Sequence, residues 1–212
     1  MLAITEPDRP AGAIGFAAPS PTRQRILAAA RALLREGSYR GFSMDQLARG
    51  CGLSRQTLYN QFADRDSVYR ASRTQLLLAV EPRLPRAPGP FEKAVRLEAL
   101  VEAALAALAM PEHVELGRSA DVDGAACPWV AALYDARIAQ PLVRAIQACL
   151  LSDRADCSFA RPADLFAMLR AAAREPGGAP AFSAAELATI FLGRIPAPTV
   201  HAAFAAKKAG LG

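Results

Sequence analysis

The segment from Gly52 to Phe62 carries side chains that can hydrogen-bond to the edges of nucleic-acid bases. Its polar positions include Arg55, Gln56 and Asn60. Arginine can form paired hydrogen bonds with guanine, and glutamine or asparagine can do so with adenine. The segment also lacks any acidic residue, which DNA phosphates would repel. These residue types predict contact with base edges.

Apolar residues in the same segment predict the element that presents these side chains. Leu53, Leu58 and Phe62 have the spacing of a buried helical stripe. We expect a short helix from Arg55 to about Gln61, with Ser54 as its N-cap. The apolar side of this helix would face a core, and its polar side would face a partner.

A second short helix is expected just before this one, over residues 44–49. Ser43 and Gln46 have the spacing of a capping box at its start. A turn at residues 50–52 follows, in which Gly52 can adopt a positive φ without strain. Two short helices joined by such a turn form a helix-turn-helix, whose second helix lies in the major groove of DNA.

Longer helices are expected on both sides of this motif. The apolar positions of residues 23–36 form one helical stripe, with Thr22 as the expected N-cap and Gly37 as the stop. Asp64 is expected to cap a further helix that continues towards Pro82. The segment therefore resembles a small helical domain built around the helix-turn-helix.

Positive charge is concentrated in this part of the chain. The whole chain has a formal net charge of +5, and residues 22–75 contain ten arginines against four acidic residues. The remaining residues carry slightly more acidic than basic side chains. A basic module joined to a near-neutral body indicates a polyanionic partner for the module alone.

The motifs over residues 23–70 resemble the N-terminal domain of the TetR/AcrR family of transcriptional regulators. The matching features are RxxILxAAxxLLxxxG in the first helix, then FSMDQLARGCGLS, then TLYNQF in the recognition helix. The resemblance implies a homodimer that binds a palindromic operator, most commonly as a repressor released by a small-molecule effector. Arg65 stands where the family usually has lysine, and Cys51 where it commonly has alanine.

The family positions also assign site residues. Base contacts are expected from Arg55, Gln56 and Asn60. Phosphate contacts are expected from Ser43, Thr57, Tyr59 and Arg65.

Composition supports an all-α fold without membrane spans. Of the 212 residues, 52% are hydrophobic and only 7% are aromatic, with many alanines, and alanine favours helices. No run of about 18 apolar residues is present, and no secretion signal is recognisable, which favours a cytoplasmic location. Residues 1–21 contain four prolines and are expected to be a flexible arm.

The expected organisation is a DNA-binding domain over residues 22–81 and a larger helical ligand-binding and dimerisation domain over 82–212. About nine or ten helices are expected in total. In the second domain, helices are expected over 91–110, 162–174 and 184–195, with a loop over 117–128. Residues 129–151 are expected to form either one helix kinked at Pro141 or two helices.

The resemblance places a dimer interface and an effector pocket in this second domain. The candidate dimer residues are Leu165, Phe166, Leu169, Leu187, Ile190 and Phe191, which could alternatively fill their own core. The candidate pocket residues are His113, Trp129 and Tyr134, and the two aromatic residues could alternatively only pack.

Three other functions remain open from the sequence. A redox-responsive regulator on the same scaffold would use Cys149 and Cys157. An enzyme with a basic surface would need converging titratable groups, and the two histidines, His113 and His201, are far apart in sequence. No cofactor or metal is expected, because no residues have ligand spacing. A non-specific DNA-coating protein would need basic charge beyond residue 75.

Overall fold

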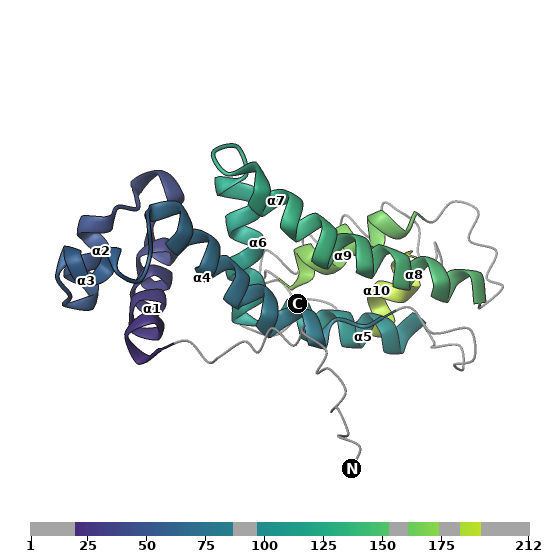
Figure 1. The fold of residues 1–212 in the computed structure, drawn as a ribbon. Coiled ribbons are helices and arrows are strands. Elements are labelled where there is room, and N and C mark those ends of the chain that lie inside the picture. Colours follow the sequence, from purple (N-terminus) through teal and green to yellow (C-terminus); the bar gives the residue numbers. More distant parts are fainter. Residues whose placement is uncertain (1–19, 87–96, 153–160, 174–182, 192–212) are drawn as a thin grey trace, which may run out of the picture.

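The computed structural model describes residues 20–86, 97–152, 161–173 and 183–191. Within these ranges all regular secondary structure is helical, with ten α-helices, which confirms the expected all-α fold (Figure 1). Most of the predicted arm, the start of the helix predicted from residue 91 and the end of the helix predicted over 184–195 lie outside these ranges. The boundary predicted between residues 81 and 82 falls within a 3-10 turn.

The N-terminal elements follow the predicted order. They are α1 (Pro21–Glu36), η1 (Tyr39–Gly41), α2 (Met44–Cys51), α3 (Arg55–Tyr59), α4 (Arg65–Val80) and η2 (Glu81–Arg83). The start of α1 differs from expectation, since Ser20 rather than Thr22 is the N-cap and accepts a hydrogen bond from the Arg23 amide at 3.2 Å. Proline suits the first turn of a helix because it has no N–H to leave unpaired. Pro21 therefore lets α1 begin earlier.

The local signals around the helix-turn-helix are confirmed. Ser43 and Gln46 form a capping box at the start of α2, and the Ser54 side chain caps α3. Asp64 caps α4 in a second capping box with Ser67. Gly52 ends α2 with φ 60°, in the left-handed region that favours glycine.

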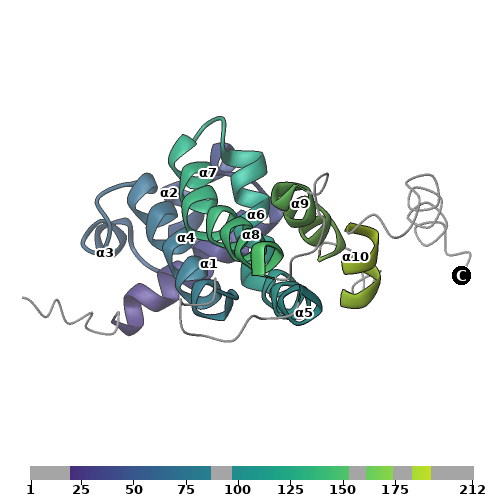
Figure 2. The same cartoon turned by 90° about the vertical axis from the view of Figure 1, so that its right-hand side faces the viewer.

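The C-terminal elements pack into the larger part of the molecule. They are α5 (Leu97–Leu108), α6 (Pro111–Asp123), α7 (Pro128–Tyr134), η3 (Asp135–Ala139), α8 (Gln140–Ser152), α9 (Pro162–Ala172) and α10 (Ala184–Phe191). Helix α5 packs against α8, α9 and α10. These helices lie at the opposite end of the molecule from α3 (Figure 1), and Figure 2 shows α9 and α10 on the side away from it.

The loop predicted over residues 117–128 is wrong for residues 117–123, because α6 continues as far as Asp123; only residues 124–127 connect it to α7. Half of the buried positions of this helix carry polar or acidic side chains on one stripe, namely Glu115, Ser119 and Asp123. They have i, i+4 spacing and pair with side chains of the N-terminal helices. A helix whose buried side chains are largely polar has no clear hydrophobic periodicity, so periodicity alone predicts a loop there.

Helix α7 continues through η3 into α8, so the stretch over 129–151 is one helical run. The η3 segment is a π-helical turn in which the Gln140 amide donates to the Asp135 carbonyl. Pro141 follows directly and has no N–H for the helical ladder. Such π turns accommodate local breaks in α-helical hydrogen bonding.

Helix α4 joins the two parts of the molecule. It packs against α1 on one side and α6 on the other, and it runs from the helix-turn-helix into the larger body (Figure 1). Its buried residues include Val68, Tyr69, Leu76 and Leu77. The apolar core is continuous between the two parts through this helix.

Candidate nucleic-acid interface

Helix α3 presents its polar side chains to solvent and its apolar ones to the core. Arg55, Gln56 and Asn60 are exposed on its outer surface. Leu58 is completely buried, and Phe62, just beyond the helix, is 3% exposed. The three predicted base-facing residues therefore lie together on one accessible surface.

Each of these three side chains has a defined partner. Arg55 Nη2 lies 2.6 Å from Asp45 Oδ2 in α2. Gln56 Nε2 donates to Asn60 Oδ1 at 3.1 Å, one helical turn away. The hydrogen-bonding groups are thereby oriented before any partner binds.

Three of the predicted phosphate contacts surround this surface. Ser43 Oγ donates to Gln46 Oε1 at 3.0 Å within the capping box. The hydroxyls of Thr57 and Ser54 are 2.9 Å apart. The Tyr59 side chain is 50% exposed and is therefore the most accessible of the three.

Arg65, the fourth predicted phosphate contact, is also part of an internal cluster. Its guanidinium donates to Tyr39 Oη at 2.9 Å and to the Phe42 carbonyl at 3.3 Å. It also lies over the Tyr39 ring, 4.2 Å from the centroid. The Tyr39 hydroxyl donates to Asp66, and this bond, together with burial, raises the pKa of Tyr39.

Arg23 holds the end of the recognition helix, a role that no pattern in the sequence indicated. Its Nη1 donates to the Gln61 carbonyl at 2.7 Å. Its guanidinium lies 3.9 Å from the centre of the Phe62 ring. The contact joins α1 to the chain just after α3, between residues 38 positions apart.

A buried ion-pair cluster joins the N-terminal helices to α6. Glu115 accepts from Arg73 at 2.9 Å and from Arg31 at 3.2 Å. Arg73 also donates to Ser119 Oγ at 2.6 Å, and its side chain is only 1% exposed. Burial lowers the pKa of Arg73, while the charge of Glu115 acts in the opposite direction.

A second polar joint forms at the other end of α6. Asp123 accepts from the Tyr39 backbone N–H at 3.0 Å and from the Tyr69 hydroxyl at 2.6 Å. Burial and the bond to Asp123 raise the pKa of Tyr69. Asp123 lies within the loop predicted over residues 117–128, yet it is only 5% exposed.

Comparison with known proteins places this helix-turn-helix in a family. The family model described as "Bacterial regulatory proteins, tetR family" matches residues 26–72. The HTH-type transcriptional regulator EthR of Mycolicibacterium smegmatis is 37% identical over 70 residues, which are 33% of this chain and 29% of that protein. The chain thus spans less than a third of the length of this curated relative.

The helix-turn-helix over residues 26–72 is therefore of the TetR-family type. Solved structures extend the likeness of fold beyond the matched domain. Salmonella enterica GusR has a TM-score of 0.58 at 20% identity, over 84% of this chain and 97% of GusR. A TetR-family regulator of Pseudomonas syringae pv. tomato has a TM-score of 0.55 at 20% identity, over 81% and 95% of the two chains.

The TetR-family resemblance also suggested pocket residues, and the structure does not bring all three together. His113 is buried, with Nδ1 2.6 Å from the Leu108 carbonyl and Nε2 2.8 Å from Tyr134 Oη. Trp129 instead contacts α4, where its ring packs edge-on against Tyr69 and under the guanidinium of Arg70.

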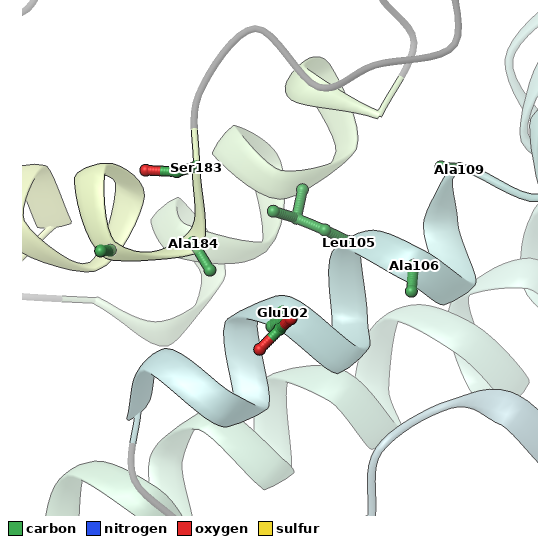
Figure 3. A pocket seen from close by; sticks show the side chains of 7 residues that line it. Glu102, Leu105, Ala106, Ala109, Ser183 and Ala184 are labelled. Atoms are coloured by element: carbon green, nitrogen blue, oxygen red, sulfur yellow. The ribbon is translucent and has the colours of Figure 1, made fainter.

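A surface hollow of about 550 Å³ lies elsewhere in the C-terminal part, between α5 and the start of α10. Figure 3 shows Leu105 and Ala106 of α5 on one side and Ser183 and Ala184 on the other. None of the three predicted pocket residues lines it.

The six predicted dimer residues are unequally accessible. Leu165, Leu169 and Leu187 are completely buried within their own chain, and Phe191 is 9% exposed. Phe166 and Ile190 are only partly buried. The assignment stays a prediction, and within the six residues these last two have the surface that a partner could contact.

The remaining candidate features give no further site. Cys149 is buried, and Cys157 lies outside the described residues. Within the described ranges, no group of His, Cys, Asp and Glu side chains has the arrangement of a metal site. No helix in the same ranges is long and apolar enough to span a membrane.

Proposed function

We propose that this chain acts as a homodimer in the cytoplasm, binds a palindromic DNA operator through α3, and represses transcription until a small molecule releases it. The observation that carries the proposal is the exposed polar surface of α3, whose side chains are already oriented by Asp45 and by each other. Side chains that are oriented in advance lose less conformational entropy on binding.

The pair formed by Gln56 and Asn60 suits adenine. Because Gln56 Nε2 donates to Asn60 Oδ1, the Gln56 carbonyl oxygen and the Asn60 amide nitrogen remain for another partner. In the major groove adenine offers a donor at N6 and an acceptor at N7. One acceptor and one donor on the protein match these two groups, so we propose that the two side chains recognise one base as a unit.

Dimerisation follows from the small reach of α3, which has only five residues. One copy can contact few base pairs, whereas two copies related by a two-fold axis can contact two half-sites. We propose that α9 and α10 supply the interface, with Phe166 and Ile190 as its contact residues. Effector binding in the C-terminal part would act on α3 through α6 and α4, which the buried polar joints connect.

The proposal is tested by selecting bound duplexes from a random DNA pool. The wild-type protein should enrich a palindrome. Gln56→Ala should reduce the base preference at one position in each half-site, at a cost of about 1–3 kcal/mol of binding free energy per contact. Adding Asn60→Ala should cost little more, because the two residues act as a unit, and Gln147→Ala on α8 is the control. Failure of the wild-type protein to enrich any sequence would overturn the proposal.

The dimer is tested separately by sedimentation. Ile190→Glu should shift the protein towards monomer and weaken operator binding, while Ala185→Glu on another face of α10 should do neither. A dimer that survives Ile190→Glu would place the interface elsewhere. Thermal-shift screening of small molecules would then identify the effector through its stabilisation of the folded protein.

A further inference from the structure

We propose that Asp45 is a specificity-determining residue, which positions the Arg55 guanidinium for guanine and prevents it from binding a DNA phosphate instead. The inference rests on the proposed function and adds a residue that would not itself contact DNA. It also predicts that removing an acidic residue weakens base discrimination while strengthening general DNA binding.

Asp45 lies in the first turn of α2, where an acidic side chain suits the helix dipole. It is the one acidic residue between Glu36 and Asp64, a stretch that contains the whole helix-turn-helix. Its carboxylate is about half exposed, on the same surface as the candidate base-facing residues. A negative charge there opposes the approach of phosphates, so general affinity for DNA does not explain its presence.

The pair has a minor role in holding the two helices together. The side chains of Arg55 and Asp45 are 69% and 49% exposed. Exposed ion pairs of this kind contribute little to stability because water and salt screen them. Helix α2 already packs against α3, and Met44, Leu47 and Leu58 lie in the same buried core.

The geometry suits the orientation of a guanidinium. Arginine has five N–H donors in a planar fork, and a single contact joins Arg55 Nη2 to Asp45 Oδ2 at 2.6 Å. The fork retains donors for the O6 and N7 acceptors of guanine. Without Asp45 the flexible side chain would be free to pair with the nearest phosphate, a contact that carries no sequence information.

The experiment uses the full-length protein and the duplex enriched by the wild type. Binding is measured to that duplex, to its symmetric single-base variants and to a random duplex, each at several salt concentrations. The variants are Asp45→Ala, Asp45→Glu, Arg55→Ala and the double variant Asp45→Ala with Arg55→Ala. Asp164→Ala, in the first turn of α9, is the control for net charge.

Asp45→Ala should lose about tenfold in discrimination at one base per half-site. It should also bind random DNA more tightly. Its affinity should fall more steeply as salt rises, by an amount that corresponds to about one more released counterion. Asp45→Glu should restore part of the discrimination. In the Arg55→Ala background, removal of Asp45 should leave base preference unchanged, because Asp45 acts through Arg55.

Three results would overturn the inference while leaving the proposed function intact. The first is an unchanged base preference in Asp45→Ala, and the second is weaker rather than tighter binding of that variant to random DNA. The third is that removing Asp45 reduces base preference equally in the wild-type protein and in the Arg55→Ala variant. A wild-type protein that selects no sequence overturns the proposed function itself, and the inference with it. Thermal unfolding of each variant separates these results from a loss of fold.

Discussion

Two arginine–carboxylate pairs in this chain have the same chemistry and opposite surroundings. Arg73 and Glu115 are 1% and 8% exposed, at the joint between α4 and α6. Arg55 and Asp45 are 69% and 49% exposed, on the outer surface of the helix-turn-helix. The first pair cannot be broken without leaving a buried charge, whereas the second can exchange its partner for water or DNA.

The difference in exposure gives the two ion pairs different roles. A buried pair fixes how two helices meet, because each charge needs the other in a region that water does not reach. An exposed pair only biases the direction of a side chain, at little cost to the fold. We therefore expect substitutions at α4 and α6 to change stability, and substitutions on the surface of α3 to change recognition.

The largest expected effect is at the buried pair. Glu115→Ala would leave Arg73 uncompensated in the interior and should lower the free energy of unfolding by about 3–5 kcal/mol. Asp121→Ala is the matched control on the same helix, since its pair with Arg170 is partly exposed. Its expected cost is below about 1 kcal/mol. Equal losses in urea unfolding would contradict the comparison.

The second effect concerns the hydroxyl of Tyr69. Tyr69→Phe would leave Asp123 short of a buried hydrogen bond and should cost about 1–3 kcal/mol. Tyr59→Phe, at an exposed tyrosine, should leave unfolding unchanged. Circular dichroism during urea titration measures both, and a similar cost at the two positions would contradict the distinction between the regions.

The pKa of Tyr69 adds a dependence on pH. Because its pKa is raised in the folded state, the unfolded chain releases this proton first. The contribution of the Tyr69 hydroxyl to the free energy of unfolding is fully present below about pH 10. Above that pH it should fall by up to about 1.4 kcal/mol per pH unit. The Tyr39 hydroxyl has a shift in the same direction. Tyr69→Phe should reduce the alkaline loss, and an unchanged alkaline slope would contradict this assignment.

The third effect, intermediate in size, concerns the stability contributed by Arg23. Arg23→Ala removes the bond to the Gln61 carbonyl and the contact with the Phe62 ring, at an expected cost of about 1–2 kcal/mol. Hydrogen exchange in α3 should also become faster, because α1 no longer holds its end. Arg25→Ala, an exposed neighbour on α1, is the control. Unchanged exchange in α3 would show that Arg23 does not restrain it.

The smallest expected effect is at the exposed pair. Asp45→Ala should change the free energy of unfolding by less than about 1 kcal/mol, and the change should shrink further in salt. Thermal melts at low and high salt measure it. A loss as large as that of Glu115→Ala would mean that the pair holds α2 to α3.

Features set by neighbouring residues could be predicted from the sequence. The capping boxes at Ser43 and Asp64, the Ser54 cap and the left-handed Gly52 depend on residues at most a few positions apart. The exposed surface of α3 also follows from local spacing. The path of α6 could not be predicted in the same way, because half of its buried positions carry polar or acidic side chains.

Contacts between distant parts of the chain could not be predicted from neighbouring residues. Arg23 reaches Gln61, and Tyr39 donates its backbone N–H to Asp123, 84 positions away. Even the pairing of Asp45 with Arg55 depends on the angle at which α2 meets α3. Of the three pocket candidates only His113 and Tyr134 come together, since Trp129 and Tyr134 lie in one short helix but face different neighbours.

The π-helical turn at η3 has a consequence for how this helix tolerates changes in length. A hydrogen bond between residues five apart encloses one residue more than the usual α-helical bond. Deleting a single residue from 135–139 could therefore restore a regular α-helix and keep the inward residues of α8, such as Leu142 and Ile146, facing the core. The same deletion within α8 would rotate every residue that follows. Single-residue length variation among related chains should accordingly be found at this turn.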